Sequence, residues 1–556
     1  MPRRPSMSRK VSLYRLDSRQ DDELRSHIQS KYLDAEEFRA WDVLVAGVDG
    51  LLVAGVIASS SPKWLSHVQS LVDLSPDLSN NTSAAVLLVP YERYVYTLSW
   101  GFGHLIVEPG DIDPGFGLRF ALRRANPEQV RALTVHTMDT LARTARTTVP
   151  GGATLDAFGM EEIGEIVSRL VGRVSSAGLT AARGSGNDAV TIRGADGLSI
   201  PLGREAEGLL ADLRFLHTVV EHESPIAGLE HFEQTKPLRS GDPAVETLKE
   251  RLAEALIPGA QRIALSWPAE WEEDYGEADG YFLAGLGRGW DDRPDTLELE
   301  HLLGALAERS SETRLAALKR IKIQALDANG GAVSRAISGD KWITFEDDLH
   351  GQRYVFHQGR WFNIGSAYLD MLRGKISRIF AQRSMLELPA WPKTQKKNGV
   401  GPVIERRYNE YASAQNDSLL CLDRKLIRTE QHDRGIEACD LLGPDNELIH
   451  VKRLGDSVSA SHLFNQATVS AEALRRQADA QESFRARVRE VSNGARDLPE
   501  DFRPRKVVLA FAEREATPRA LMTFSQVTLA RCAQRIGELD MDLEIVEIGD
   551  SEDLIE

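Results

Sequence analysis

The chain has 556 residues, which at about 150 residues per domain predicts three to four domains and excludes a single small module. It is 42% hydrophobic and 27% charged and lacks a long unbroken apolar run, so we expect a globular protein without a membrane span. The formal net charge of -16 excludes a general polyanion-coating protein, because non-specific nucleic-acid binding depends on phosphate neutralisation. A local basic groove stays compatible with this charge.

The first ten residues are basic but continue into polar sequence without an apolar segment, so no secretory signal is expected and a cytoplasmic location is predicted. The three cysteines (Cys421, Cys439 and Cys532) are too few and too widely spaced for a disulfide framework or a four-cysteine zinc site. A reducing compartment agrees with this pattern.

Residues 1–125 are expected to form an N-terminal mixed α/β domain. A strand is predicted over 10–16 and a polar helix over 21–38. Two β-rich runs at 84–91 and 93–107 are joined closely enough to predict a hairpin.

Residues 126–310 are expected to form a mostly helical middle region with one β-hairpin. Helical spacing predicts helices over 126–145, capped at Asn126, and over 160–174. The hairpin is predicted to turn at residues 195–197.

A long helix is predicted over 296–320, followed by an antiparallel β-meander over 311–370 in which apolar residues alternate between glycine-rich turns. Six aromatic residues of the meander alternate with basic ones, which fits either an ordinary core or a stacking platform for single-stranded nucleic acid, and the core is favoured. These are Trp342, Phe345, Tyr354, Phe356, Trp361 and Phe362. Residues 371–400 contain seven Lys or Arg against one acid and are interpreted as a basic linker.

The last segment, residues 401–556, alternates helices and strands and contains the one constellation that suggests chemistry. Asp440 ends one strand, and His450 and Lys452 lie in the next, after a turn at residues 443–446. The two-residue period of a strand predicts that His450 and Lys452 share a face. A carboxylate opposite a His and a Lys can hold a divalent metal and activate a water, which is the chemistry of phosphodiester hydrolysis.

This hairpin resembles the PD-(D/E)XK nuclease superfamily, in which an acid in one strand and a D/E-x-K motif in the next form the site. The resemblance assigns metal binding to Asp440, water positioning to Lys452, a helix acid to Glu410 and a supporting role to Gln466. His450 stands where the family has its second acid, so it is expected as a third metal ligand with Asp440 and Glu410. Glu437 is an alternative acid, although its odd spacing from Asp440 predicts the opposite strand face.

The whole chain is also similar to a sporadically distributed bacterial family of unknown function (DUF6119-like). The resemblance is carried by RYNEYAS, by IEACDLL followed by IHVKR, and by SHLFNQATVSAEAL. Patchy distribution implies mobile or defence islands, and several defence systems use nuclease domains.

Together these resemblances imply α/β and α+β folds in a multidomain chain, with a C-terminal restriction-endonuclease-like mixed sheet flanked by helices. The expected function is a Mg²⁺- or Mn²⁺-dependent nuclease acting on nucleic acid, DNA rather than RNA, in anti-phage or foreign-DNA defence. The expected partner is nucleic acid and not a membrane, and the chain is compatible with a homo-oligomer.

Other interpretations stay open for the same residues. Asp440 can simply end a strand, Lys452 can be a surface residue of an edge strand, and His450 can be a satisfied buried histidine. Gln466 falls on one helical stripe with His462 and Ser470, which fits a solvated face unless that stripe meets the hairpin. The alternative functions are an inactive nuclease-like fold that binds nucleic acid or senses a partner, and a toxin acting through the N-terminal domain.

Overall fold

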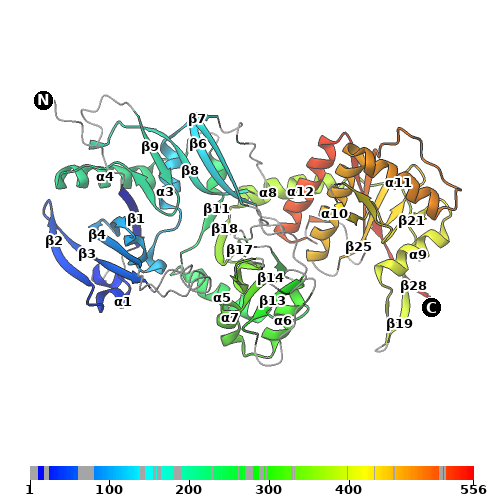
Figure 1. Ribbon diagram of the computed structural model, residues 1–556, viewed down its shortest axis with the longest axis horizontal. Helices are drawn as coiled ribbons and strands as arrows, with labels where there is room; N and C mark the ends of the chain where they lie inside the picture. Colours follow the sequence, from blue (N-terminus) through cyan, green and yellow to red (C-terminus); the bar gives the residue numbers. More distant parts are fainter. Residues whose placement is uncertain are drawn as a thin grey trace, which may run out of the picture.

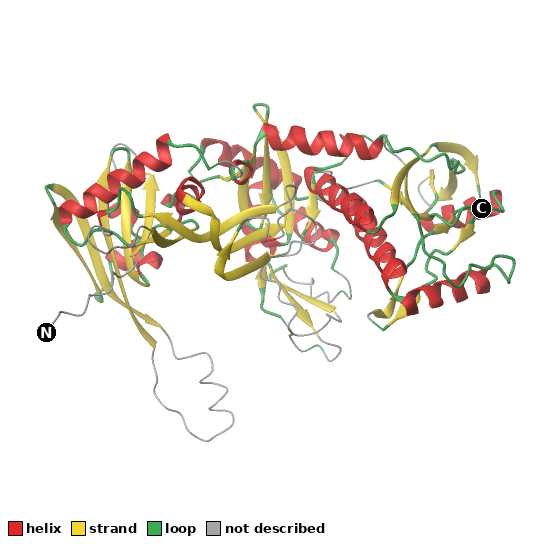
Figure 2. Ribbon diagram, turned by 90° about the horizontal axis from the view of Figure 1, so that it is seen from above, coloured by secondary structure: helices red, strands yellow, loops and turns green. Residues whose placement is uncertain are grey.

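The computed structural model shows a mixed α+β protein built from several sheets, with eleven α-helices in the part of the chain that it describes (Figure 1). Viewed from above, the N-terminal sheet and the C-terminal unit lie at opposite ends of the molecule (Figure 2). The described residues are 11–17, 24–59, 80–137, 144–154, 158, 165–180, 189–226, 229–239, 241–260, 262–266, 268, 280–286, 294, 297–326, 330, 332, 334–396, 399–430, 432–454, 457–512, 517–518 and 521–555.

The N-terminal half is built on a ten-stranded antiparallel sheet. It confirms the predicted first strand and both predicted hairpins, one at 84–107 and one that turns at 195–197. In order across the sheet, the strands are β2 (Phe38–Val45), β3 (Val48–Ser59), β4 (Asn80–Tyr91), β5 (Tyr94–Gly101), β1 (Val11–Asp17), β10 (Leu198–Ile200), β9 (Ala189–Gly194), β8 (Glu165–Ser175), β6 (Ala125–Thr137) and β7 (Thr144–Ala153).

Helices α3 (Phe116–Arg124) and α4 (Ala206–His222) cover one face of this sheet and enclose a core that includes Leu13, Phe120 and Leu216. Where a polar helix over 21–38 is predicted, the described residues form only the 3-10 turn η1 (Leu24–His27) and the short helix α1 (Ser30–Leu33), followed by the start of β2.

The helices predicted over 126–145 and 160–174 are wrong, because the described residues of these segments form strands β6, β7 and β8. Ile166, Leu170 and Val174 are spaced by four, which fits a helix, but an even spacing fits one face of a strand equally well. The strand is favoured because β8 pairs over a long stretch with β6 and with β9, and because β-branched residues are common in these segments. Asn126 accepts a bond from the Glu128 N–H at 3.0 Å inside β6 and caps no helix.

The middle of the chain holds two further sheets around a shared apolar core. The predicted meander is confirmed for β16 to β18, but β14 and β15 belong to a separate three-stranded sheet, and the predicted long helix is two helices, α6 and α7. The elements are β11 (Thr235–Pro237), β18 (Arg360–Ile364), β17 (Gln352–His357), β16 (Ile343–Leu349) and β12 (Ile263–Leu265) in one sheet, β13 (Gly280–Ala284), β14 (Lys322–Leu326) and β15 (Ile337–Ser338) in the other, and helices α5 (Pro243–Ala255), α6 (Leu299–Ala307) and α7 (Ser311–Arg320).

The meander aromatics form core rather than a platform. Five of the six are at most 8% exposed, and they pack within the core of the middle unit, as the favoured interpretation predicts. These five are Trp342, Phe345, Tyr354, Phe356 and Trp361.

The segment interpreted as a basic linker, residues 371–400, contains regular structure in place of a tether. Most of helix α8 (Ser366–Phe380) and all of strand β19 (Trp391–Lys396) lie in it. Apolar residues of α8 such as Leu372 and Ile376 are buried against the C-terminal unit, which explains why the stretch folds despite its charge. Figure 1 shows α8 beside α12 (Thr523–Glu538).

The C-terminal unit is a mixed five-stranded sheet with helices on both faces. Strands β25, β26 and β27 are parallel, while β21 and β24 run antiparallel to their neighbours. The elements of the unit are β21 (Leu420–Cys421), β24 (Leu441–Leu442), β25 (Leu448–Arg453), β26 (Lys506–Ala512) and β27 (Asp542–Ile548), helices α9 (Glu405–Gln415), α10 (Ser457–Arg476) and α11 (Ala478–Val491), the sheet of β20 (Gly399–Pro402), β19 and β28 (Asp550–Leu554), and the hairpin of β22 (Ile427–Thr429) and β23 (His432–Ile436).

Helix α9 covers one face of the five-stranded sheet, through Tyr408 and Ala412, and α10 and α12 cover the other, through Phe464 and Phe524. Because both faces are buried, the central strand β26 is apolar from Val507 to Ala512, and β25 carries one buried polar residue, His450, among its first four. Polar side chains are therefore concentrated at the ends of these strands.

Candidate metal centre

Three carboxylates meet at the edge of the C-terminal sheet. Asp423 follows β21, Glu437 follows β23, and Asp440 immediately precedes β24. One oxygen from each lies within 4.8 Å of the others, which is the spacing of ligands around one metal ion. An all-oxygen, all-carboxylate set suits a hard divalent cation such as Mg²⁺ or Mn²⁺.

Asp440 is tied directly to the strand that carries Lys452. Its backbone N–H donates to the Ile449 carbonyl at 3.0 Å, and its carboxylate accepts the Val451 N–H at 2.7 Å. The side chain is 8% exposed. The carboxylate therefore accepts the Val451 N–H in place of a backbone carbonyl of the paired strand. This bond fixes the position of the carboxylate where β24 and β25 begin to pair.

Glu437 joins the site despite its odd spacing from Asp440. Residues 437–440 have no ladder pairing between β23 and β24, so the two-residue alternation of side chains does not apply there. Glu437 accepts the Gln466 side-chain amide at 2.8 Å and the backbone N–H of Arg424. Gln466 therefore lies on a face of α10 that meets the site.

Asp423 is held from the other side of the sheet. The side-chain amide of Asn409, a buried residue of α9, donates to the Asp423 carboxylate at 3.1 Å. The next residue, Arg424, has a φ of 58°, so the chain turns sharply here. This turn directs the Arg424 N–H to Glu437 and brings the two acids together.

The electrostatics of the cluster favour a bound cation. Burial raises the pKa of Asp440 well above its usual value, and the nearby Glu437, Asp423 and Glu405 raise it further, against the Val451 N–H that lowers it. Burial also raises the pKa of Glu437, with Asp423 adding to the effect. Like charges this close disfavour full ionisation, and a divalent cation would reverse that preference.

Lys452 is paired with an acid of α9, Glu405, whose charge also raises the pKa of Asp440. Its ammonium donates to the Glu405 carboxylate at 2.8 Å, and the Arg453 N–H donates to the other oxygen of Glu405 at 3.5 Å. Lys452 is 22% and Glu405 36% exposed, so water reaches the pair. The ammonium is fixed at the strand end without being buried.

Glu410, expected as the helix acid, lies elsewhere on α9. It is 46% exposed and pairs with Arg406 at 3.0 Å. Glu405 and Asn409 are four residues apart and therefore share the helix face that meets the site. Glu410 is one residue beyond Asn409 and therefore projects from a different side of the helix. The structure does not bring Glu410 into the acidic cluster.

His450, expected as a metal ligand, lies in the core between the sheet and α10. It is fully buried, its Nε2 is 3.2 Å from the Ser470 hydroxyl, and burial lowers its pKa to about 3. Alternation gives His450 and Lys452 the same face, but Lys452, near the strand end, pairs with Glu405 of α9 instead of entering the core. His450 is a neutral core histidine in this arrangement.

Of the residues singled out from sequence, Asp440 and the alternative acid Glu437 belong to the cluster, and Gln466 donates to Glu437. Lys452 follows Val451, whose N–H binds Asp440, but its ammonium pairs with Glu405 outside the cluster. Sequence reasoning missed Asp423 and Glu405 altogether. The four-residue spacing of Glu405 and Asn409 was an available signal, because it marks one helix face. Asp423 carried no such signal, since it sits in an irregular turn.

A basic hollow adjoins the cluster. Its volume is about 630 Å³, and its lining contains four cationic residues against the single acid Glu490. The cationic residues are Arg424, Lys425, Arg428 and Arg487. Arg424 directly follows Asp423, so positive charge for phosphate contacts lies next to the carboxylates.

The chain belongs to a family of unknown function (DUF6119), whose model matches residues 11–549. Neither a search of curated proteins nor one of solved structures found a match to the chain. Within the described residues, every helix is too short or too polar to cross a lipid bilayer.

Proposed function

We propose that this protein is a metal-dependent nuclease that hydrolyses phosphodiester bonds of nucleic acid, DNA rather than RNA, in anti-phage or foreign-DNA defence. The observation that carries the proposal is the set of three carboxylates within 4.8 Å of one another, of which Asp440 accepts the backbone N–H of Val451, the residue before Lys452. The mixed sheet with helices on both faces and the resemblance of the hairpin to PD-(D/E)XK nucleases support a restriction-endonuclease-like fold for this unit.

Asp423, Glu437 and Asp440 would hold the ion, with Glu437 taking the place that the sequence gives to His450. When bound, Mg²⁺ or Mn²⁺ would neutralise phosphate charge and lower the pKa of a coordinated water. The site fits such an ion because burial, with the charges of neighbouring acids added, raises the pKa of Asp440 and of Glu437, and a bound cation would favour their ionised forms.

The protein's own residues have separate roles around this centre. Gln466 and Asn409 each donate to one carboxylate and so fix which oxygen faces the ion. Lys452, held by Glu405, would orient the attacking water and oppose charge on the phosphate. The basic hollow beside Arg424 would bind the nucleic-acid backbone.

The test is cleavage of linear, supercoiled and single-stranded DNA and of RNA by the full-length protein with Mg²⁺ or Mn²⁺. We expect Lys452→Ala and Glu437→Gln to reduce the rate by at least 100-fold, because each removes a group from the reacting centre. Glu410→Gln is the matched control, since it neutralises an acid of α9 outside the cluster, and it should retain wild-type activity. Absence of cleavage on every substrate, or equal loss in the control, would contradict the proposal.

A second candidate is an inactive nuclease-like protein that binds nucleic acid or senses a partner. It is favoured by one observation, the buried His450 at the position where the resembled family has an acid. Binding of DNA and Mn²⁺ without cleavage would support this candidate over the first.

A further inference from the structure

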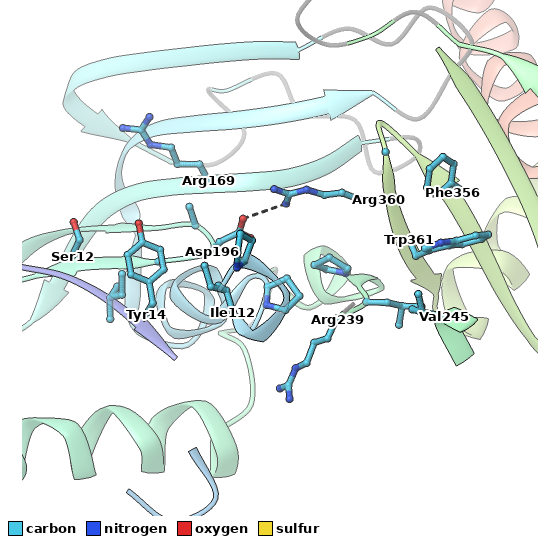
Figure 3. Close-up of a pocket in the computed structure, with 18 of the residues that line it drawn as sticks. Ser12, Tyr14, Ile112, Arg169, Asp196, Arg239, Val245, Phe356, Arg360 and Trp361 are labelled. Atoms are coloured by element: carbon cyan, nitrogen blue, oxygen red, sulfur yellow. Dashed lines mark hydrogen bonds and ion pairs between the residues drawn. The ribbon is translucent and has the colours of Figure 1, made fainter. Parts of the chain in front are cut away.

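A large cavity lies in the other half of the molecule, between the N-terminal sheet and the middle unit. Its volume is about 620 Å³, within the range of about 300 to 1,000 Å³ typical of small-ligand sites. Figure 3 shows Ser12, Tyr14 and Arg169 on one wall and Val245, Phe356 and Trp361 on the other. It belongs to elements that take no part in the acidic cluster.

Strand alternation explains the polar wall of this cavity. Residues of β1, β8 and β9 that point toward α3 and α4 form the apolar core, so the intervening ones face the opposite side. Tyr14, Arg169 and Arg193 are on that opposite face, and register places Ser12 and Arg193 on either side of Ser199 in β10. Hydroxyl and guanidinium groups therefore line one surface.

The cavity is strongly basic in a chain whose net charge is -16. Its lining contains six cationic residues and one acid, Asp196. The cationic residues are Arg169, Arg193, Arg239, Lys249, Lys319 and Arg360.

Three of these cations are already neutralised by protein carboxylates. Arg239 pairs with Asp17 at 2.6 Å and with the buried Asp113 at 2.9 Å. Lys249 pairs with Glu246 at 2.6 Å, and Arg360 pairs with Asp196 at 3.2 Å. The last pair spans the two walls of the cavity, as the dashed line in Figure 3 shows.

The other three, Arg169, Arg193 and Lys319, have no carboxylate partner among the described residues. Burial lowers the pKa of Arg169, and repulsion from Arg146 and Arg193 lowers it further. The buried Nε of Arg169 also lacks a hydrogen-bond partner within the described part of the chain. Cations held this close without a counter-charge cost free energy, which a bound anion would recover.

We propose that this cavity binds a small, multiply phosphorylated ligand of about nucleotide size. Planar guanidinium groups bind phosphate oxygens in pairs, and Arg169 and Arg193 provide two of them, with Lys319 as a point charge from the opposite wall. Ser12, Tyr14 and Ser199 provide neutral hydroxyl donors. The Arg360–Asp196 bridge between the walls favours a small ligand over a continuous nucleic-acid strand.

The proposal is tested by isothermal titration calorimetry of the full-length protein with ATP, tripolyphosphate, adenosine and a single-stranded oligonucleotide. EDTA is present throughout, so the acidic cluster holds no metal and cannot contribute. We expect ATP or tripolyphosphate to bind and adenosine to bind at least tenfold more weakly. ATP binding tighter than tripolyphosphate supports a nucleotide, and equal binding supports recognition of the phosphate chain alone.

Matched variants locate the binding. Arg193→Gln and Lys319→Gln should each weaken ATP or tripolyphosphate at least tenfold, while Arg173→Gln and Arg320→Gln should change it less than twofold. Arg173 lies on the same strand as Arg169, and Arg320 follows Lys319 in α7, but neither lines the cavity. Equal affinity in all four variants, no binding at about 1 mM, or binding of the oligonucleotide alone would overturn the proposal.

Discussion

The carboxylate of Asp440 is held almost without water while two other acids approach it, and its ionisation is therefore disfavoured in the folded chain. The folded chain retains a proton on Asp440 that the unfolded chain releases above pH about 4. The folded state then binds more protons than the unfolded state, so the stability contribution falls as the pH rises above about 4. A bound divalent cation removes this penalty.

We expect Asp440→Asn to stabilise the metal-free protein at pH 8 by about 1–3 kcal/mol, because an amide needs no proton uptake on folding and keeps an acceptor for the Val451 N–H. The gain should disappear as the pH approaches 4. Thermal unfolding of both proteins between pH 4 and 8 in EDTA measures it. Addition of Mn²⁺ should raise the Tm of the wild type alone, and a similar rise in the variant would exclude Asp440 as a ligand.

His450, in the neighbouring strand β25, gives the opposite pH dependence of stability. Its pKa is lowered to about 3 by burial, so between pH 3 and 6.5 the unfolded state binds the extra proton and stability rises with pH. We expect His450→Ala to cost about 2–4 kcal/mol at pH 7, through the cavity it leaves. The loss of stability caused by His450→Ala should be smaller at acidic pH. There the wild-type protein is itself less stable, because its folded state keeps His450 neutral while its unfolded state binds a proton.

Mn²⁺ affinity separates this structural role from a ligand role. His450→Ala should leave the affinity within twofold of wild type, measured by calorimetry at a temperature where the variant is folded. Ser470→Ala is the control, because it removes the partner of His450 without touching the acids. A tenfold loss in His450→Ala alone would restore His450 to the ligand set.

At the scale of elements, the metal centre depends on two helices that flank one sheet edge. Helix α9 supplies Asn409 and Glu405, and α10 supplies Gln466, so the acids are oriented from both faces. Each helix is anchored by its apolar stripe rather than by the polar contact. Removing one polar contact should therefore disturb the site and spare the fold.

We expect Gln466→Ala to weaken Mn²⁺ binding about tenfold, because groups that orient metal ligands typically contribute 10- to 100-fold. The free energy of unfolding should change by less than about 1 kcal/mol, since Gln466 is only partly buried. Calorimetry with Mn²⁺ and urea unfolding in EDTA measure the two quantities. Thr468→Ala, on the same helix and away from Glu437, is the control, and equal Mn²⁺ affinity in both variants would contradict this role.

Predictions from sequence were correct for several regular elements of the C-terminal unit and wrong for two long strands of the N-terminal sheet. Helices α9 and α10 and strand β25 match their predictions, and with them Lys452 and Gln466 reach the site. Glu437 could not be placed by strand parity, because residues 437–440 are irregular. Strands β6 and β8 were misassigned because a four-residue spacing of apolar residues fits both a helix and a strand until pairing partners are known.

At the scale of the whole molecule, the middle unit and the C-terminal unit share contacts that a linker would not provide. The buried Glu346 of β16 accepts the backbone N–H of Thr523, at the start of α12, at 2.8 Å. Arg353 of β17 pairs with Glu346 at 2.9 Å and donates to the Thr523 hydroxyl at 2.9 Å. A carboxylate at a helix N-terminus is favourable, so this contact joins the two units as well as capping α12.

Helix α8 extends the same coupling through apolar packing. Leu372, Ile376 and Phe380 are buried with residues of the C-terminal sheet and helices. Further along, Trp391 stacks on Tyr408 of α9 with ring centroids 4.1 Å apart. A nuclease-like unit that begins at residue 401 would therefore lose part of its own core, although the basic sequence of 371–400 suggests a boundary.

We expect a fragment of residues 366–556 to be markedly more stable than one of residues 401–556. The shorter fragment exposes the apolar surfaces that α8 and Trp391 cover, and burying even one large side chain contributes about 1.5–3 kcal/mol. Urea unfolding followed by far-ultraviolet circular dichroism measures the free energy of both, and we expect a difference of several kcal/mol or a failure of the shorter one to fold. Equal stability would show that residue 401 is a true domain boundary and that α8 packs on the C-terminal unit without supporting it.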